Sequence, residues 1–82
     1  MYQTFNEPII VAGVFNHQGF QPRKFRWRQR DYRIETITVV TNIKDCGVIK
    51  RGYGVVAGGN VYRLEFNRST DHWQLIEVWY EG

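Results

Sequence analysis

The chain has 82 residues and a formal net charge of +3, and 43% of its residues are hydrophobic and 16% aromatic. A chain this short has room for one core, and it buries only about 60–65% of its unfolded surface on folding, so its margin of stability is expected to be small. The aromatic content predicts an ordered domain and argues against disorder. The single cysteine, Cys46, excludes an internal disulfide.

Membrane insertion and secretion are not expected. No apolar run approaches the roughly 20 residues that a membrane-spanning helix needs. The start, MYQTFNEPII, lacks the basic flank and apolar core of a signal peptide. Secreted domains of this size also carry several disulfides as a rule. We therefore expect a soluble, cytoplasmic protein with no membrane contact.

Most apolar side chains alternate with polar ones, which is typical of strands with one buried face. A first strand is predicted over Ile9–Phe15, followed by a loop over Asn16–Pro22. The next segment, Arg23–Arg28, alternates strictly, so Phe25 and Trp27 are expected in the core. Lys24, Arg26 and Arg28 are then expected on the opposite face.

A tight turn is predicted in RQRD, and a longer strand over Tyr32–Ile43. The inward residues of this strand change parity, from Tyr32 and Ile34 to Ile37 and Val39. That change predicts a β-bulge near Glu35–Thr36, where the strand bends between two parts of a barrel.

Two hairpins are predicted in the second half. KDCG forms a turn, VIKRGYGVVA a strand, and Gly58–Gly59 a two-residue loop of the primed type before NVYRLEFN. This loop fixes a register in which opposite residues share a face. The predicted pairs are Val55 with Tyr62, Tyr53 with Leu64, and Arg51 with Phe66.

The last segment, HWQLIEVWYEG, has two interpretations. A hairpin that pairs Asn67 with His72 places Phe66 opposite Trp73 and Leu64 opposite Leu75. A helix is the alternative, because Trp73, Ile76 and Tyr80 have helical spacing and Ser69 or Thr70 can cap it. We favour a strand, because Ile, Val, Trp and Tyr prefer sheets.

The sequence therefore predicts one all-β domain over residues 1–82. We expect five or six antiparallel strands that form a small sheet or a partly open SH3-like barrel. A second apolar face remains to be explained. It is either buried by closure of the barrel or used for a partner, and it comprises Val56, Val61, Ile76 and Val78.

Catalytic and metal signatures are weak. Cys46, His17 and His72 are too widely separated to indicate a metal site or a Cys–His nucleophile pair. GYGVVAGG resembles a phosphate loop, but a strand pattern follows it where such loops need a helix. We expect no enzyme activity, no cofactor and no metal.

The stretch RKFRWRQRDYR (Arg23–Arg33) holds six of the eleven Lys and Arg residues. On the predicted hairpin five of these side chains form a ridge about 15–20 Å long, with a spacing that suits phosphates. The candidate nucleic-acid-binding residues are Lys24, Arg26, Arg28 and Arg33, with Arg30 at the tip. An acidic protein partner, or a solvated face that Asp31 and Glu35 partly neutralise, are the alternatives.

EPIIV, PRKFRWRQRDYRI and VYRLEFNRSTDHWQLIEVW resemble an uncharacterised family of short bacterial proteins. Its members share an F-x-W-R-x-R-x-Y motif and end in Y-x-L-x-F, a turn and W-x-L. Some are encoded beside translesion DNA polymerases, so the resemblance implies a setting in DNA metabolism through gene neighbourhood alone.

The leading hypothesis is a non-enzymatic binding module that contacts the backbone of single- or double-stranded nucleic acid without reading sequence. The alternative is a protein-interaction or homodimerisation module that uses the second apolar face. A monomer and a homodimer are both compatible with the sequence.

Overall fold

The computed structural model describes residues 1–81, and in this range the chain forms seven strands and no helix. The strands are β1 (Tyr2–Asn16), β2 (Gly19–Trp27), β3 (Arg30–Arg33), β4 (Thr36–Asp45), β5 (Val48–Ala57), β6 (Asn60–Asn67) and β7 (His72–Trp79). They form one antiparallel sheet in the order β3-β2-β1-β7-β6-β5-β4. The all-β antiparallel prediction is confirmed, with seven strands in place of five or six.

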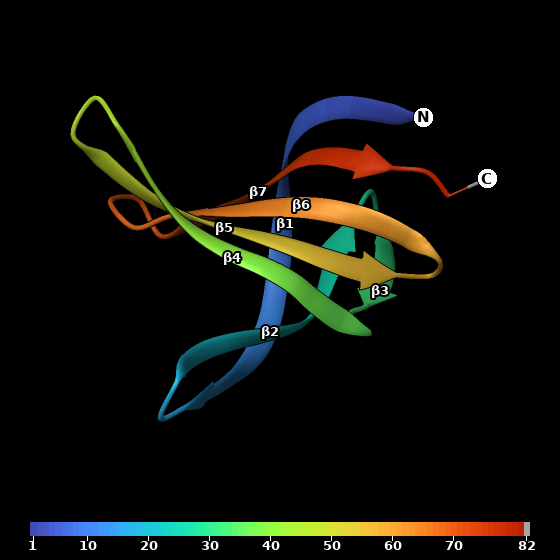
Figure 1. Ribbon diagram of the computed structural model, residues 1–82, viewed down its shortest axis with the longest axis horizontal. Helices are drawn as coiled ribbons and strands as arrows, with labels where there is room; N and C mark the ends of the chain where they lie inside the picture. Colours follow the sequence, from blue (N-terminus) through green and yellow to red (C-terminus); the bar gives the residue numbers. More distant parts are fainter. Residues whose placement is uncertain (82) are drawn as a thin grey trace.

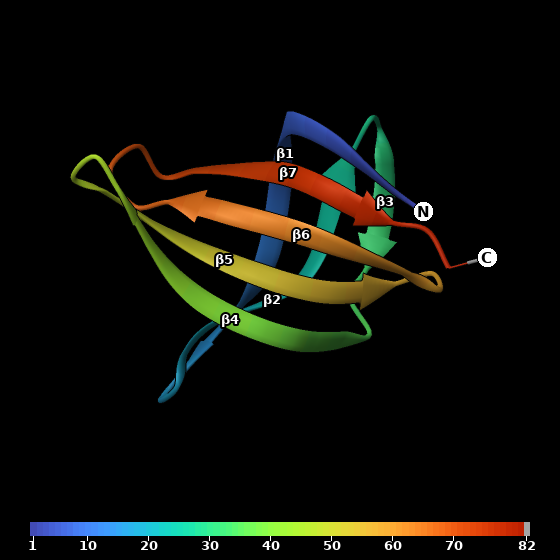
Figure 2. The same ribbon diagram turned by 45° about the horizontal axis from the view of Figure 1, so that its top comes forward.

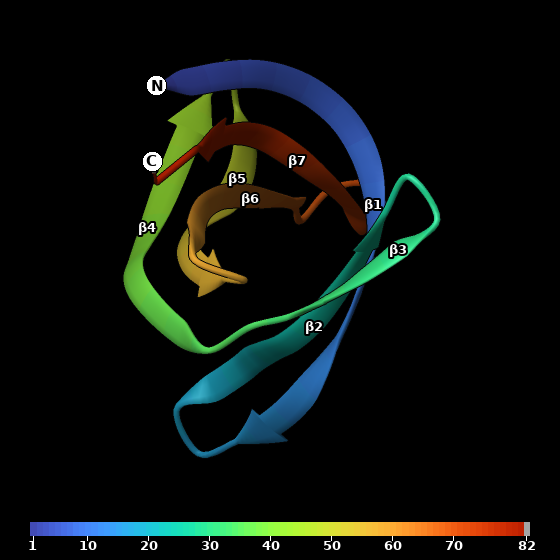
Figure 3. The same ribbon diagram turned by 90° about the vertical axis from the view of Figure 1, so that its right-hand side faces the viewer.

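A bend in β1 divides the sheet into two layers. The first half of β1 pairs with β7, and its second half, from Ile10 onward, pairs with β2. The bend coincides with a register shift between Thr4 and Glu7 and with a left-handed residue, Asn6. Bulges of this kind increase local twist. As a result, β1 and β2 cross the direction of β5 and β6, and the strands curl around a common interior (Figures 1 and 3).

The Tyr32–Ile43 prediction is wrong in one respect, because this segment is two strands and not one bulged strand. β3 ends at Arg33 and β4 begins at Thr36, at opposite ends of the strand order. The Ile34 N–H donates to the Arg23 carbonyl (2.9 Å), whereas the Glu35 N–H donates to the Val56 carbonyl (2.8 Å). One residue step thus passes from one layer to the other (Figure 3). The change of parity in the inward-facing residues of this segment therefore reflects the crossing between layers and not a bulge within one strand.

The first strand was predicted too short and its loop too long. β1 begins at Tyr2, and the expected Asn16–Pro22 loop shrinks to a turn at His17–Gln18. Phe15 pairs with Phe20 and Asn16 with Gly19, so the segment after the turn is already strand. Pro22 is accommodated where the β1–β2 register shifts between Ala12 and Gly13.

The hairpin predictions for the second half are confirmed. Gly58 and Gly59 have φ of 56° and 82°, as a primed turn requires, and Cys46–Gly47 form the expected turn between β4 and β5. β7 is a strand and not a helix. The predicted pairs all occur: Val55 with Tyr62, Tyr53 with Leu64, Arg51 with Phe66, Phe66 with Trp73, and Leu64 with Leu75.

The sequence prediction placed one residue too many, Val78, on the second apolar face. A register shift between Arg63 and Leu64 places Val78 opposite Tyr62, and Val78 is completely buried. Ile76 is the extra residue of this bulge, which the hairpin register alone did not reveal. Val56, Val61 and Ile76 are half-buried.

The core lies between the two layers and is rich in aromatic side chains. Phe25, which is 1% exposed, stacks on Tyr32 with ring centroids 4.9 Å apart and meets the edge of Tyr62 at 5.1 Å. The predicted inward direction of Phe25 and Trp27 is therefore confirmed. Figure 2 shows β1 and β2 passing behind β5, β6 and β7. The buried hydrophobic residues are Ile9, Phe25, Trp27, Tyr53, Val55, Ala57, Tyr62, Leu64, Leu75 and Val78.

Candidate nucleic-acid interface

The outer face of β1, β2 and β3 carries the predicted basic residues. The β2–β3 register places Lys24 opposite Arg33 and Arg26 opposite Asp31, so these four side chains share one face. All four are exposed, while Phe25 between Lys24 and Arg26 is buried beneath them. The alternation expected for β2 is what creates this face.

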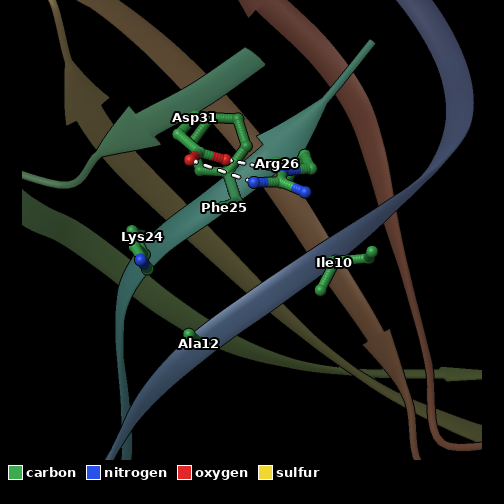
Figure 4. Close-up of a pocket in the computed structure, with 6 residues that line it drawn as sticks. All are labelled: Ile10, Ala12, Lys24, Phe25, Arg26 and Asp31. Atoms are coloured by element: carbon green, nitrogen blue, oxygen red, sulfur yellow. Dashed lines mark hydrogen bonds and ion pairs between the residues drawn. The ribbon is translucent and has the colours of Figure 1, made fainter. Parts of the chain in front are cut away.

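Arg26 is paired with Asp31 in the middle of this face. Its Nε lies 2.7 Å from Asp31 Oδ1 and its second guanidinium nitrogen 3.2 Å from Oδ2. Figure 4 shows the two side chains turned toward each other, with Lys24 farther along β2. The hydrogen bond to Arg26 lowers the pKa of Asp31, and the same bond raises the pKa of Arg26. The Arg26 guanidinium is thus engaged by the Asp31 carboxylate, whose negative charge repels a phosphate group.

Arg28 does not belong to the ridge, which corrects the sequence prediction. β2 ends at Trp27, and Arg28 and Gln29 form the turn with φ of 53° and 65°. Arg28 donates to both carboxylate oxygens of Glu7, at 2.9 and 2.7 Å. Its guanidinium also lies 4.8 Å from the centroid of Trp27. The left-handed turn thus directs Arg28 toward the core side of the hairpin.

Glu7 binds two side chains at this end of the core. Besides Arg28, it accepts a hydrogen bond of 2.8 Å from the indole N–H of Trp27. Hydrogen bonds from Arg28 and Trp27 hold the pKa of Glu7 below its ordinary value, and the bond to Glu7 raises the pKa of Arg28. No local sequence pattern indicates this contact, because it joins residues 21 apart across the bend of β1.

Arg30 is also misplaced by the ridge prediction. It is the first residue of β3 and pairs with Trp27, so its position belongs to the opposite face from Lys24 and Arg33. Arg30 is exposed at the end of the hairpin. The structure therefore brings Lys24, Arg26 and Arg33 together and separates Arg28 and Arg30 from them.

Arg23 joins the outer face at a point that strict alternation does not predict. The register shift of β1 against β2 falls beside it, since Gly13 pairs with Pro22 and Ala12 with Lys24. Arg23, Lys24 and Arg33 line one shallow surface depression of about 480 Å³, which Asp31 lines as well. Within residues 1–81, none of these three forms an ion pair with an acid. We call Arg23, Lys24 and Arg33 the free basic cluster.

Apolar side chains border the cluster on β1. Ile10 pairs with Arg26 and is 69% exposed, and Val14 is 46% exposed. Ala12 lies between them and pairs with Lys24. The outer face thus combines positive charge with an apolar strip, and the ring that borders the depression, that of Tyr32, is half-buried.

No group of three or more His, Cys, Asp or Glu residues is placed to hold a metal ion within residues 1–81. Cys46 is a free, exposed thiol in the β4–β5 turn. Residues 1–81 include no helix that is long and apolar enough to cross a membrane.

Fold and site together define a small antiparallel β domain with one basic outer face. Comparison of the chain with protein-family models, with curated proteins and with solved structures finds no match.

Proposed function

We propose that this protein is a non-enzymatic binding module that contacts the sugar–phosphate backbone of nucleic acid through the free basic cluster. The observation that carries the proposal is the placement of Lys24 directly opposite Arg33, both exposed and neither in an ion pair within residues 1–81. Opposite side chains on antiparallel strands lie about 5 Å apart at Cβ. The two cations can therefore reach one phosphate or two neighbouring ones.

Contact with the nucleic-acid backbone, without reading of the base sequence, is favoured because, within residues 1–81, this face offers no fully exposed aromatic ring for stacking on a base. Reading a base requires contact with its edge or stacking on its ring. Phe25 and Trp27 are directed inward, being 1% and 7% exposed, and the half-buried Tyr32 is stacked on Phe25. Charge remains as the attractive term, and charge alone binds all sequences similarly. The resemblance to proteins encoded beside DNA polymerases is compatible with this proposal and stays a prediction.

The salt dependence of binding tests the proposal quantitatively. Each phosphate contact contributes about −0.7 to the log–log slope of affinity against salt on single strands. Three free cations give a slope of about −2, whereas all five residues of the sequence-predicted ridge give about −3.5. Fluorescence anisotropy of a labelled oligonucleotide at several salt concentrations measures this slope. Absence of binding at low salt contradicts the proposal.

A lysine pair provides the matched variants. Lys24→Glu is expected to weaken oligonucleotide binding at low salt by about tenfold and to reduce the slope by about one contact. Lys44→Glu makes the same change of charge on an exposed residue of β4, remote from the cluster. It is expected to weaken binding less than about threefold. Equal effects of both variants show attraction by net charge alone and contradict a defined interface.

A second candidate function is self-association through the outer face of the β4–β7 layer. Tyr2, Trp79, Val61 and Val56 form one row of opposite residues across β1, β7, β6 and β5. Tyr2 and Trp79 stack with centroids 4.8 Å apart and are 54% and 47% exposed.

A second copy of the chain is the partner that this row suits best. The next row holds Arg63 with Glu77, so a copy related by two-fold symmetry finds both signs of charge there. Light scattering tests this candidate. A dimer that Trp79→Ser dissociates supports it, and a monomer at high protein concentration contradicts it.

A further inference from the structure

A second concave site lies at the other end of the β1–β2 hairpin, on the inner side of the sheet. Its walls come from the tip of that hairpin and from β5, β6 and β7, and it encloses about 350 Å³. That volume falls within the range of about 300–1,000 Å³ typical of small-molecule sites. Figure 1 shows the β1–β2 hairpin extending away from the ends of β5, β6 and β7. We call this site the aromatic–arginine pocket.

Aromatic rings form most of its lining. Trp73 lies at the centre, 5.0 Å from Phe66, 5.4 Å from Tyr53 and 5.9 Å from Phe20 between ring centroids. Phe15 extends the series, 5.0 Å from Phe20, and is 82% exposed. A ring packed only to complete a core would be covered. The exposure of Phe15 leaves a broad apolar surface open at the mouth of the pocket.

Arg51 brings to the pocket a guanidinium group that forms no ion pair within residues 1–81. Its Nε atom is buried and has no hydrogen-bond partner. Its guanidinium lies 5.8 Å from the centroid of the Tyr53 ring. In the strand register, Arg51 stands opposite Phe66 on β6 and Asn42 on β4. A buried donor without a partner is costly, so native proteins rarely retain one that no ligand or water meets.

A second cation, Arg68, lines the same pocket and is exposed. Its backbone N–H donates to the Ile49 carbonyl, which fixes the chain at this point. No Asp or Glu lines the pocket, and neither Arg51 nor Arg68 forms an ion pair within residues 1–81. The pocket therefore combines a stacking surface with two unneutralised guanidinium groups.

We propose that the aromatic–arginine pocket binds a nucleotide, with the base against Trp73 and Phe15 and the phosphate on Arg51 and Arg68. A planar ring and an anion in one ligand match the two features of the lining. Guanidinium groups donate in a planar fork that fits phosphate oxygens, and aromatic side chains stack on any base. A purely apolar ligand would leave both arginines unused.

The pocket and the free basic cluster are separate sites. The pocket lies on the inner side of the β1–β2 hairpin, where Phe15 pairs with Phe20, while Lys24 and Arg33 project from the outer face. Binding of a free nucleotide in the pocket does not depend on backbone contact at the cluster. Either proposal can therefore fail while the other stands.

Adenosine 5′-monophosphate is the probe, observed by NMR through the indole N–H signals. The chain has three tryptophans, Trp27, Trp73 and Trp79, and only Trp73 lines the pocket. We expect the nucleotide to shift the Trp73 signal in the range of about 1 mM or below, leaving the other two unchanged. Adenosine lacks the charge and inorganic phosphate lacks the ring, so each is expected to bind about tenfold more weakly.

Arg51→Met is the key variant, because it keeps the apolar stem and removes the guanidinium. It is expected to weaken adenosine monophosphate binding about tenfold, the effect of losing one charge-assisted hydrogen bond. Its denaturation midpoint is expected to stay or to rise, since the unsatisfied Nε is removed. Arg33→Met is the matched control in the basic cluster and is expected to leave binding in the pocket unchanged.

Three results overturn this inference. The first is an unchanged Trp73 signal, or equal shifts of all three indoles. The second is equal binding of adenosine and its monophosphate, which shows an apolar site that does not use the arginines. The third is tighter binding of an acidic, aromatic dipeptide than of the nucleotide, which assigns the pocket to a peptide. Loss of oligonucleotide binding in Lys24→Glu with intact nucleotide binding separates the two sites.

Discussion

The two faces of the β2–β3 hairpin each carry an arginine–carboxylate pair, and the pairs have different consequences. Arg28 and Glu7 lie 21 residues apart in the chain, and their ion pair connects the β2–β3 turn to β1. Both also contact the Trp27 side chain. Arg26 and Asp31 lie five residues apart, directly opposite each other on two strands, with more than half of each side chain exposed. The two arginines are equally exposed, at 58% for Arg28 and 59% for Arg26, so the pairs differ in their carboxylates. Glu7 is less exposed and also accepts from the Trp27 indole, whereas Asp31 offsets positive charge on the outer face.

The largest expected effect is the loss of stability when a buried ring on the inner face of the hairpin is removed. Phe25→Ala removes a ring that is 1% exposed, that stacks on Tyr32 and that makes an edge contact with Tyr62. Truncations of this kind cost about 3–5 kcal/mol, a large part of the stability of a small domain. Urea denaturation followed by fluorescence measures the loss. Lys24→Ala, one position away on the outer face, is expected to change stability by less than about 0.5 kcal/mol. Similar losses in both variants contradict the assignment of faces.

The next effect separates the two ion pairs by their contribution to stability. Glu7→Ala leaves the Trp27 indole N–H and the Arg28 guanidinium without their common acceptor. We expect the thermal midpoint of this variant to fall measurably. Asp31→Ala removes an exposed local pair, and such pairs contribute little, so its midpoint is expected to stay within error of the parent protein. Equal midpoints for the two variants contradict the distinction.

The same pair of carboxylates is expected to act in the reverse order on binding. Asp31→Asn releases Arg26 on the outer face, so oligonucleotide affinity rises at low salt. The salt slope then steepens by about 0.7, the contribution of one further contact. Glu7→Gln releases Arg28 on the core side, away from Lys24 and Arg33, and is expected to leave the slope unchanged. Anisotropy titrations of both variants measure this, and an equal gain from both places Arg28 back in the interface.

The second half of the fold was predictable because its turns fix its registers. Gly58–Gly59 and the Asn67–His72 pair determine which residues of β5, β6 and β7 oppose each other. The prediction failed where a bulge adds a residue. The shift beside Leu64 moved Val78 into the core, and neither side chain composition nor spacing marks that position. Bulges depend on how the sheet bends over its core, which a local pattern does not contain.

The candidate site was predictable only as far as one strand determines it. Alternation in β2 placed Lys24 and Arg26 on the outer face, and the register of the turn added Arg33. Arg28 was misplaced because its left-handed φ ends the alternation, and its partner Glu7 comes from the bend of β1. The aromatic–arginine pocket was not foreseen at all, since its rings come from five strands.

The smallest expected effect is the pH dependence that the two carboxylates contribute to stability. Hydrogen bonds from Arg28 and Trp27 hold the pKa of Glu7 below its ordinary value of 4.5, and the hydrogen bond from Arg26 holds that of Asp31 below 3.8. A carboxyl group whose pKa is lowered by folding stabilises the protein at pH values above its unfolded pKa. This contribution is lost as the pH falls through the folded pKa.

Glu7→Gln should therefore flatten the acid limb of stability below about pH 4.5, and its midpoint should approach that of the parent protein at the lowest pH. Asp31→Asn should act only at lower pH and more weakly, because its pair is local and exposed. Thermal midpoints measured from about pH 6 to about pH 3 test both statements. A difference between Glu7→Gln and the parent protein that grows toward acid pH would reverse the sign and contradict the inner pair's role in stability.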